Sequence, residues 1–510
     1  MRLRPEGLSR SRNAEVVVLG GGPAGCAAAL VLAGAGHSVT LVRPEHPPGA
    51  SLAQSVPPSA RALLSDLGML ERVEAAGFVS NRGNTVRWAG SLGRTERFPE
   101  GEYGFHVDRG GLEAALDTVI SSAGVHVLRG AAARSAEPLD EGWRVRCLTP
   151  AGRSTEIETP WVVDATGRHG FFARRLGRRP DRRTTTLALV SRVEGPADNP
   201  DIEGHTLVES FEDGWAWSVP VAPGIRCVTA MIDPRETHVD PEGLAPALAS
   251  RLRTAPLVAS ASGGSELRDV WACPASLYTC ERYTDDRIVL AGDAGAFIDP
   301  LSSYGVKKAL ASGRLAGIVV STAISDRGMA EAALGYHDAH ERRVARDYIA
   351  RSAAFFQEAA DRYRHPFWTR RLAAARSPGP HGGMGATDTA PVANEIATPV
   401  ADVRRAHETL RSAPRLSLRA GSTSRSVEAP ALAGRRVVME DHLVSDPHPT
   451  PIRFHRSVDL RMLVRLAPRH DNVADLWSAY NRSGVQTDLP EFITALAAAC
   501  AAGFLTTEGP

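Results

Sequence analysis

The chain of 510 residues has almost no lysine: Lys307 and Lys308 are the only two, and arginine supplies the rest of its Lys/Arg charge. Acidic and basic residues nearly cancel to a net charge of +1, which gives no electrostatic footprint for nucleic acid or acidic lipid. No uninterrupted apolar run approaches the roughly 20 residues of a membrane span, and the N-terminus lacks the apolar stretch of a signal peptide. We therefore expect a cytoplasmic protein that binds neither membrane nor nucleic acid.

Cysteine is scarce as well. The six cysteines are scattered without the spacing of zinc ligands or of a disulfide framework, so we predict no metal site. Only Cys273 and Cys280 lie near each other, and they are expected to be core thiols rather than a redox pair. With 43% apolar residues, the chain has enough hydrophobic side chains for two or three globular domains.

A glycine-rich turn near the N-terminus indicates a dinucleotide site. Residues 16–19 form an apolar run typical of a buried parallel strand, an alanine-rich helix follows, and a second strand is expected at 38–42. The turn between strand and helix has the pattern G-x-G-x-x-G, in which glycines let backbone N–H groups approach a pyrophosphate at the positive end of the helix. The predicted cofactor contacts in this turn are Gly20, Gly22, Ala24 and Gly25.

The end of the second strand departs from the usual pattern, because an acid at this position normally binds the ribose hydroxyls. Here the position holds Arg43, and the nearest acid is Glu45. Either Glu45 serves from a longer turn, or Arg43 and backbone groups hold the ribose. Arg109, at the start of a helix after a strand that begins at Gly104, is a candidate for a diphosphate or ribityl contact.

Two later strands end at the same predicted edge of the sheet. One begins at Trp161 and ends in the turn from Asp164 to Gly167, and the other leads into Gly292-Asp293. In an open α/β fold the ligand binds at the carboxyl ends of the strands, where the carboxylates of Asp164 and Asp293 could hold ribityl hydroxyls. Asp and Gly at strand ends are also common turn formers, and that structural role is the alternative.

The segment 299–306 has the sequence Asp-Pro-Leu-Ser-Ser-Tyr-Gly-Val. Pro300 would begin a helix, and the free N–H groups from Tyr304 to Val306 would stabilise the negative charge of a reduced flavin. Pro300, Gly305 and Val306 are therefore predicted cofactor contacts.

Together these motifs resemble those of FAD-dependent monooxygenases of the para-hydroxybenzoate hydroxylase superfamily, especially its tryptophan-halogenase-like branch. Three segments carry the closer resemblance: 55–64 is similar to the flavin-contacting loop of that branch, 215–220 to its W-x-W-x-I-P signature, and 299–306 to its D-P-x-x-S-x-G-I/V segment. The resemblance spans residues 14–350 and implies bound FAD, with further contacts from Ser55, Val56, Gly167 and Asp293.

The predicted fold class is α/β. A doubly wound, Rossmann-type FAD domain would comprise residues 14–190 and 286–376, with an antiparallel substrate-binding sheet inserted at 191–285. Residues 1–13 are expected to be a flexible tail and 377–430 a linker, and 431–510 a small, mostly helical C-terminal module for which a winged-helix-like arrangement is one option.

The resemblance leaves two chemistries to choose between, halogenation and hydroxylation. Halogenases of this branch relay hypohalous acid to the substrate through an essential lysine, but residues 1–306 contain no lysine. The Gly-Glu pair of their flavin loop is Ala53-Gln54 here, and Ser302 and Tyr304 stand where they carry Glu and often Thr. We therefore expect hydroxylation of an aromatic, indole- or tryptophan-type substrate through a C4a-hydroperoxyflavin, with O2 as co-substrate.

The D-P-L-S-S-x-G form is also similar to that of flavoproteins that oxidise a tryptophan side chain within a polypeptide during quinone-cofactor maturation. The aromatic substrate is thus expected to be free or bound to a peptide or carrier. Since no second nucleotide-binding domain is evident, a separate NAD(P)H-dependent flavin reductase would supply reduced FAD. The alternatives are a halogenase with a displaced relay residue and a maturation protein whose C-terminal module captures a polypeptide.

The predicted catalytic residues are Ser303 and Tyr304, and the predicted substrate contacts are Trp215, Trp217 and Tyr304. Trp215 and Trp217 alternate along a strand and face one side, where packing in the core is as good an interpretation as stacking on a substrate. His106 lies beside a flavin-contacting motif, and a structural role is expected for it rather than acid/base catalysis.

Overall fold

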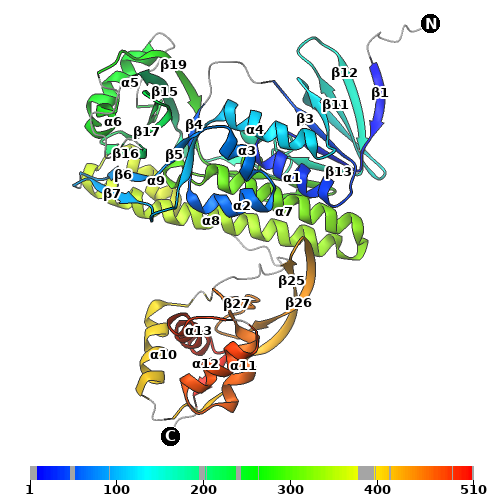
Figure 1. Cartoon of the computed structure of the whole chain (residues 1–510), viewed down its shortest axis with the longest axis vertical. Helices are drawn as coiled ribbons and strands as arrows, with labels where there is room; N and C mark the ends of the chain where they lie inside the picture. Colours follow the sequence, from blue (N-terminus) through cyan, green and yellow to red (C-terminus); the bar gives the residue numbers. More distant parts are fainter. Residues whose placement is uncertain are drawn as a thin grey trace. The chain divides into compact units, whose positions relative to one another are not determined.

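The computed structural model describes residues 8–45, 52–90, 92–194, 202, 204–236, 243–261, 264–376, 396, 398–412, 415–484 and 486–507. The chain divides into two compact units (Figure 1). The first unit comprises Met1–Ile324 and Glu341–Gly383, and the second comprises Ser325–His340 and Met384–Pro510.

A six-stranded sheet forms the centre of the first unit, in the order β21-β22-β13-β2-β3-β9. The strands from β22 to β9 run parallel, and β21 pairs antiparallel with β22 at one edge. Every residue of β2 and β13 is buried, as is typical of a parallel sheet covered on both faces. The bounds are β2 (Val16–Leu19), β3 (Val39–Arg43), β9 (His126–Arg129), β13 (Trp161–Asp164), β21 (Thr284–Asp285) and β22 (Ile288–Leu290).

Three helices lie close together beside this sheet, because both α4 and α7 contact α1. Their bounds are α1 (Pro23–Gly34), α4 (Arg109–Ser122) and α7 (Gly305–Ser325). Helix α1 begins with a proline, whose fixed φ and missing N–H suit the first helical position. Helix α7 lies close against α1, since a Cβ added at Gly313 would lie 2.0 Å from the carbonyl oxygen of Ala24. The first unit also contains α2 (Arg61–Asp66), α3 (Leu70–Ala75) and α9 (Pro366–Arg376), and the long helix α8 (Ala330–Tyr363) has residues in both units.

A second, seven-stranded sheet has the order β19-β15-β18-β17-β16-β6-β7. Its strands pair antiparallel except for β16 with β6. The expected antiparallel sheet is therefore present, but it also includes two strands from residues 83–97. We call these seven strands the substrate sheet, and their role in substrate binding stays a prediction. The bounds are β6 (Gly83–Arg87), β7 (Arg94–Arg97), β15 (Leu187–Glu194), β16 (His205–Phe211), β17 (Gly214–Ala222), β18 (Ile225–Ile232) and β19 (Arg268–Pro274).

The two faces of this sheet carry different cores, because successive side chains of a strand point to opposite faces. Along β15, Leu189 and Val193 pack toward α5 (Leu244–Arg253) and α6 (Pro256–Ser260), which lie on one side of the sheet in Figure 1. Ala188 and Val190 pack into a cluster rich in aromatic residues on the other face. That second cluster also contains Ala53, and Leu52, Phe297 and Leu301 pack against it.

Part of the segment expected to be a flexible tail forms a strand. β1 (Leu8–Asn13) pairs parallel with β12 at the edge of a sheet of order β1-β12-β11-β10. The polar sequence of β1 gave no strand pattern, because the pairing depends on backbone groups rather than on an apolar face. The partners are β10 (Ala132–Leu139), β11 (Gly142–Leu148) and β12 (Ser154–Thr159). Two smaller sheets contain β4 (Ala53–Val56), β5 (Val79–Asn81) and β8 (Gly104–Asp108), and β14 (Arg179–Pro180), β20 (Tyr278–Thr279) and β23 (Ala296–Phe297).

The second unit has its own apolar core around α13, whose Phe492 and Leu496 are fully buried. The predicted linker differs from the structure, because α10 and β24 lie within it and Leu410 of α10 joins this core. The winged-helix-like arrangement stays a prediction. The elements are α10 (Val400–Ser412), α11 (Leu460–Leu466), α12 (Val473–Arg482) and α13 (Leu489–Ala501), with paired strands β24 (Leu418–Ala420) and β29 (Leu505–Thr507), β25 (Arg425–Ala433) and β26 (Arg436–Val444), and β27 (Phe454–His455) and β28 (Val458–Asp459).

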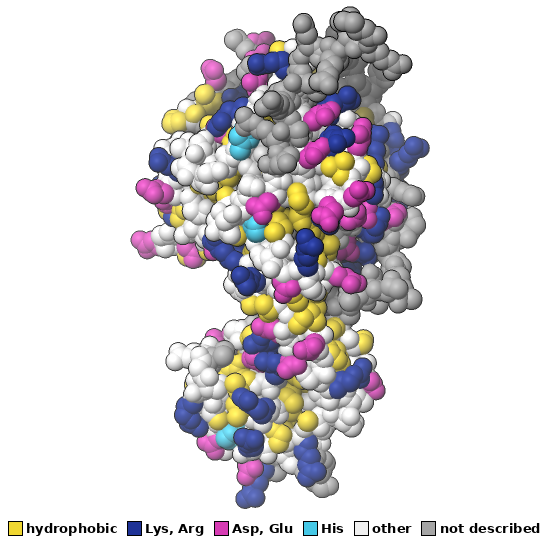
Figure 2. All heavy atoms as spheres, turned by 90° about the vertical axis from the view of Figure 1, so that its right-hand side faces the viewer, with side chains coloured by type: hydrophobic (Ala, Val, Ile, Leu, Met, Phe, Trp, Pro, Cys, Tyr) yellow, Lys and Arg dark blue, Asp and Glu magenta, His cyan; other side chains and the backbone are white. Residues whose placement is uncertain are grey.

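Basic and acidic side chains are interspersed over the face drawn in Figure 2, in keeping with the small net charge of +1. Within the described part of the chain, none of the helices combines the length and apolar character that crossing a membrane requires.

Candidate flavin site

The glycine turn lies at the carboxyl end of β2, beside the end of β13. A Cβ added at Gly20, where φ is 101°, would lie 2.3 Å from the Ala165 carbonyl oxygen, and one at Gly25 would lie 1.8 Å from the Gly20 carbonyl oxygen. The fold itself therefore requires these two glycines. At Gly22 the nearest atom to an added Cβ is a guanidinium nitrogen of Arg109, at 3.8 Å, so this face of the turn is open. An FAD diphosphate fits against that open face, at the N-terminus of α1.

Arg109 lies beside this open face. It is the first residue of α4, whose N-cap Asp108 accepts a hydrogen bond from Gly111 N at 2.9 Å. The Nε of Arg109 donates to Glu113 Oε1 at 3.0 Å, and its side chain is 42% exposed. This geometry leaves guanidinium N–H groups near Gly22, and the diphosphate contact of Arg109 stays a prediction.

The guanidinium of Arg43 turns toward α4. It donates to Asp117 Oδ1 at 2.8 Å and to the Glu113 carbonyl oxygen at 3.1 Å, and its aliphatic stem covers Gly21. Glu45, the other candidate for the ribose, lies close to Gly130 at the end of β9. Because its charged end is engaged by α4, Arg43 has the geometry of a structural brace, and its ribose contact stays a prediction.

The two strand-end aspartates differ in what their carboxylates contact. Asp164 is fully buried and accepts hydrogen bonds from Thr166 N at 3.0 Å, Thr166 Oγ1 at 2.6 Å and Phe172 N at 2.6 Å, and burial raises its pKa. Its carboxylate braces the turn that contains Gly167, so the geometry favours the structural alternative over a direct ribityl contact. The side chain of Asp293 is 32% exposed, and Lys308 Nζ lies 3.2 Å from its Oδ1. Asp293 is therefore the better placed of the two to accept a ribityl hydroxyl.

The expectation that Pro300 begins the helix is wrong, because Pro300 begins the short 3-10 turn η7 (Pro300–Ser302) and α7 begins only at Gly305. Asp299 caps the 3-10 turn by accepting a hydrogen bond from Leu301 N at 3.1 Å, and Ser303 has a left-handed backbone with φ 52°. A left-handed conformation is strained for a residue other than glycine and is often found at functional sites. The catalytic role of Ser303 stays a prediction.

The start of α7 lies next to β4. A Cβ added at Gly305 would find one neighbour within contact distance, Gln54 Nε2 at 3.9 Å. The predicted flavin contacts Ser55 and Val56 follow Gln54 on β4. Ser55 Oγ accepts hydrogen bonds from Asn81 Nδ2 at 2.8 Å and Thr206 Oγ1 at 3.1 Å, and Val56 is buried, so their flavin contacts stay predictions. Room beside Gly305 and free N–H groups at a helix N-terminus are what an anionic flavin ring requires.

Sequence reasoning missed a side chain at this helix start, Lys307. Its Nζ donates to Ser59 Oγ at 2.9 Å and lies 5.4 Å from the centre of the Tyr304 ring, and burial lowers its pKa. Tyr304 in turn packs beside Tyr348, with ring centres 6.0 Å apart. The available signal was the position of the chain's two lysines directly after the flavin segment.

Trp215 and Trp217 stack on each other, with ring centres 5.0 Å apart. Trp215 is 2% exposed and packs on Trp88, whereas Trp217 is only partly buried. The core interpretation therefore suits Trp215, and Trp217 is the better candidate for a substrate contact. The cofactor-side residues that pack on the same aromatic cluster are Leu52, Ala53, Phe297 and Leu301.

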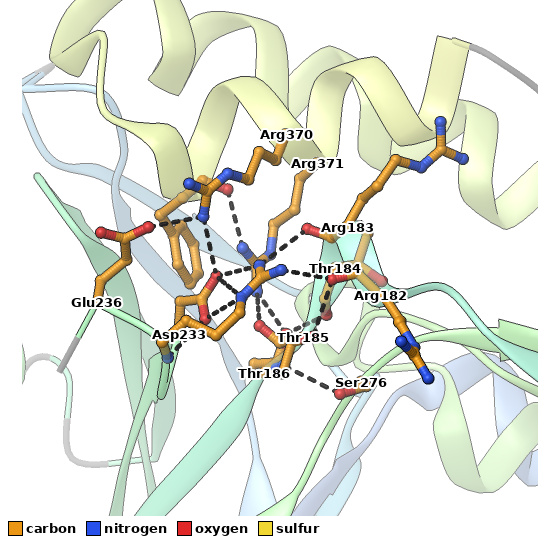
Figure 3. Close-up of polar contacts among 12 residues, drawn as sticks. Arg182, Arg183, Thr184, Thr185, Thr186, Asp233, Glu236, Ser276, Arg370 and Arg371 are labelled. Atoms are coloured by element: carbon orange, nitrogen blue, oxygen red, sulfur yellow. Dashed lines mark hydrogen bonds and ion pairs between the residues drawn. The ribbon is translucent and has the colours of Figure 1, made fainter. Parts of the chain in front are cut away.

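A buried arginine of α9, which the motifs did not indicate, joins α9 to the segment before β15 (Figure 3). The Arg371 side chain donates to the Phe367 and Thr185 carbonyl oxygens at 2.8 and 3.1 Å and to Thr186 Oγ1. Burial lowers its pKa to about 10, and the negative charge of Asp299 acts against this shift. Burial likewise raises the pKa of Asp299 to about 6. Arg371 thus fastens α9 to the segment before β15, and its positive charge acts on Asp299 of the D-P segment.

His106 of β8 is fully buried beneath the flavin loop. Its Nε2 lies 3.0 Å from Thr206 Oγ1, and burial moves its pKa well below 6.5. A neutral imidazole held in this way suits the structural role expected for His106.

The family described as FAD binding domain matches residues 13–352, and the chain belongs to this family. Within the FAD-binding monooxygenase superfamily it falls in the tryptophan-halogenase-like branch. A tryptophan 2-halogenase of Chondromyces crocatus is 28% identical over 384 residues, which are 71% of this chain and 71% of that protein. A 1H-pyrrole-2-carbonyl-[peptidyl-carrier protein] chlorinase of Pseudomonas fluorescens is 26% identical over 355 residues, or 64% of this chain and 79% of that protein.

Two solved structures share the fold over nearly the whole chain. The flavin-dependent halogenase CmlS has a TM-score of 0.77 at 22% identity, covering 98% of this chain and 96% of its own. The peptidyl tryptophan dihydroxylase QhpG, essential for tryptophylquinone cofactor biogenesis, has a TM-score of 0.64 at 21% identity, covering 95% and 98%. At this coverage the likeness includes the C-terminal module.

These similarities confirm the predicted family and a flavin-dependent oxidoreductase. They do not favour hydroxylation, the chemistry expected from the sequence, because the curated relatives are halogenases.

Proposed function

We propose that the chain halogenates an electron-rich aromatic ring with the help of FAD. When bound, reduced FAD supplies two electrons to O2, and with halide and protons this gives hypohalous acid and water. The halogenase relatives support this choice over the hydroxylation expected from the sequence. A separate NAD(P)H-dependent reductase would provide the reduced flavin.

One contact carries the proposal: the Lys307 amine donates to Ser59 Oγ at 2.9 Å, in the loop that follows the flavin strand β4. A halogen relay needs a lysine near the flavin loop. In the halogenases of this branch that lysine follows the loop in the sequence, whereas Lys307 lies at the start of α7. Its neutral amine can take the halogen from hypohalous acid with release of water, then pass it to the ring in exchange for a proton. Burial lowers the pKa of Lys307, which increases the fraction of neutral amine. Lys308 does not fit this role, because its Nζ is buried in an ion pair.

The proposed substrate is an indole or pyrrole group, either free or bound to a carrier. Two relatives, the Pseudomonas fluorescens chlorinase and a brominase of Pseudoalteromonas luteoviolacea, are named for a pyrrole-2-carbonyl group on a peptidyl carrier protein. The partly buried Trp217 offers a stacking surface for such a ring. The C-terminal module, whose winged-helix-like shape stays a prediction, is proposed to capture the carrier or peptide.

The test supplies the protein with reduced FAD, O2 and chloride or bromide, together with tryptophan, indole or a pyrrole-2-carbonyl carrier protein. Mass spectrometry should show one halogen in place of one hydrogen. Lys307→Met should abolish this product while FAD binding stays within about threefold of the wild type. Lys307→Arg is the matched variant that keeps the positive charge. Because its guanidinium stays protonated, it should also fail to form the halogenated product. Halogenation by Lys307→Met at the wild-type rate would rule out the relay.

Hydroxylation remains the second candidate because residues 1–306 contain no lysine and Gln54 replaces the loop glutamate of the halogenases. It predicts a product heavier by one oxygen, formed without halide and insensitive to Lys307→Met. A tryptophan within a peptide would be the diagnostic substrate for the third interpretation, a maturation protein.

A further inference from the structure

Lys308 of α7 is buried against the turn that follows β22. Its Nζ lies 3.2 Å from Asp293 Oδ1 and 3.4 Å from the Gly292 carbonyl oxygen, and it also contacts the carbonyl oxygen of Ala296. The lysine side chain is 4% exposed, whereas that of Asp293 is 32% exposed. The ammonium therefore holds one carboxylate oxygen from the protein side and leaves Asp293 accessible from the other side.

Helix α7 fastens the same loop at a second point, one turn after Lys308. Ser312 Oγ accepts a hydrogen bond from Gly292 N at 2.8 Å. Close packing of Gly313 against Ala24 also fixes α7 to the start of α1, beside the glycine turn. Lys308 thus acts on a loop whose backbone is already held, so the group that it can still orient is the Asp293 carboxylate.

The choice of lysine at this position is informative. A buried ammonium is costly to desolvate unless its acceptors compensate, and an uncharged side chain of similar length would avoid that cost. Apart from Lys307 and Lys308 the chain uses arginine at every position of this charge type, but a planar guanidinium does not match three acceptors that converge on one point. Burial, acceptor geometry and composition all indicate that this amine is kept for its effect on Asp293.

We propose that Lys308 is a positioning residue for FAD, which holds Asp293 Oδ1 so that the second carboxylate oxygen accepts a ribityl hydroxyl. The proposal rests on FAD binding alone and holds whether the product is halogenated or hydroxylated. It predicts an effect confined to the riboflavin half of the cofactor, because the diphosphate is placed at Gly22 and Arg109 instead.

The test measures FAD affinity of the full-length apoprotein by quenching of flavin fluorescence, and ADP affinity by competition with FAD. Lys308→Met should weaken FAD binding about 10- to 100-fold, the range for losing hydrogen bonds to a charged group, and leave ADP binding unchanged. Arg314→Met is the matched control, since Arg314 lies on the same helix and pairs with Asp66 Oδ2 at 2.6 Å. It should change neither affinity.

A double-mutant cycle with Asp293→Asn separates positioning from a general structural role. On the Asp293→Asn background, Lys308→Met should cost less than about twofold in FAD affinity. Full additivity of the two changes, or equal loss of FAD and ADP binding, would overturn the proposal. If Lys308→Met does not fold, Lys308→Gln retains a donor for the two carbonyl oxygens without the charge. The same selective loss of FAD binding is then expected, and unchanged FAD binding would refute it.

Discussion

Two regions of the molecule are built in opposite ways. One is the carboxyl end of the parallel sheet with the helices against it, where we place FAD and which we call the cofactor edge. The other is the aromatic cluster on one face of the antiparallel sheet. At the cofactor edge, Gly25 and Gly313 approach backbone oxygens so closely that no Cβ fits. The interior beside the antiparallel sheet is filled by large buried side chains, among them Trp215 of β17 and Trp368 and Arg371 of α9. The first region should be intolerant of added atoms and the second of removed atoms.

The largest effect should come from adding one methyl group at the cofactor edge. In Gly25→Ala the new Cβ would lie 1.8 Å from the Gly20 carbonyl oxygen, and only a backbone shift can relieve that overlap. Inserting an extra methyl or methylene group into a well-packed core costs about 1–3 kcal/mol, and we expect more here because the opposing atom is backbone. Thermal unfolding followed by circular dichroism should show a much lower Tm, with loss of bound FAD.

Two further glycines sharpen this prediction. Gly93→Ala is the control, because an added Cβ there meets nothing within 4 Å. Gly22→Ala should fold like the wild type and still bind FAD poorly, since its Cβ would enter the face assigned to the diphosphate. Normal FAD affinity in Gly22→Ala would show that the diphosphate lies elsewhere.

The contrast between the two regions also explains what the sequence could predict. The cofactor edge was predictable because its motifs are local: a glycine turn after an apolar strand, an aspartate after another, a proline before a helix. The local sequence pattern did not predict whether a strand-end carboxylate is buried and hydrogen-bonded within the protein or accessible. Asp164 is the first case and Asp293 the second. That distinction depends on Thr166 and Phe172, which fold back onto Asp164.

The substrate side was harder to predict because its contacts join distant segments. Strand β6 enters the substrate sheet by pairing with β16, more than 100 residues later in the chain. Arg371 reaches Thr186 from α9, and no periodicity or spacing marks that contact. The linker assigned to 377–430 failed for a similar reason, since α10 is polar on most faces and is stabilised by burying Leu410.

The next largest effect should follow removal of a large side chain from the aromatic cluster. Trp215→Ala should destabilise the fold by about 3–5 kcal/mol, as is usual for a buried tryptophan. Trp217→Ala should cost less stability, because Trp217 is only partly buried, and should raise the KM for an aromatic substrate more than it lowers kcat. Urea unfolding and steady-state kinetics on both variants test this division of roles. Equal destabilisation by the two changes, with unaltered KM, would contradict it.

The smallest effect belongs to Asp299, which lies between the two regions. Burial raises its pKa from 3.8 to about 6, so the folded state favours the protonated carboxyl. The wild type should therefore lose stability, relative to Asp299→Asn, as pH rises from about 4 through 6, by an amount that approaches about 3 kcal/mol.

Urea unfolding of both proteins at several pH values between 4 and 7.5 would measure this difference in stability. A difference that does not vary with pH would mean that Asp299 keeps an ordinary pKa when folded.

Arg371→Met provides a second test. The positive charge of Arg371 lowers the pKa of Asp299, so its removal should move the transition to higher pH. Arg370→Met removes a neighbouring charge on the same helix that pairs with Glu236 and Asp233, and it should leave the transition in place. A transition that moves only in Arg371→Met would show that the substrate side of the molecule sets the charge of the D-P segment at the cofactor edge.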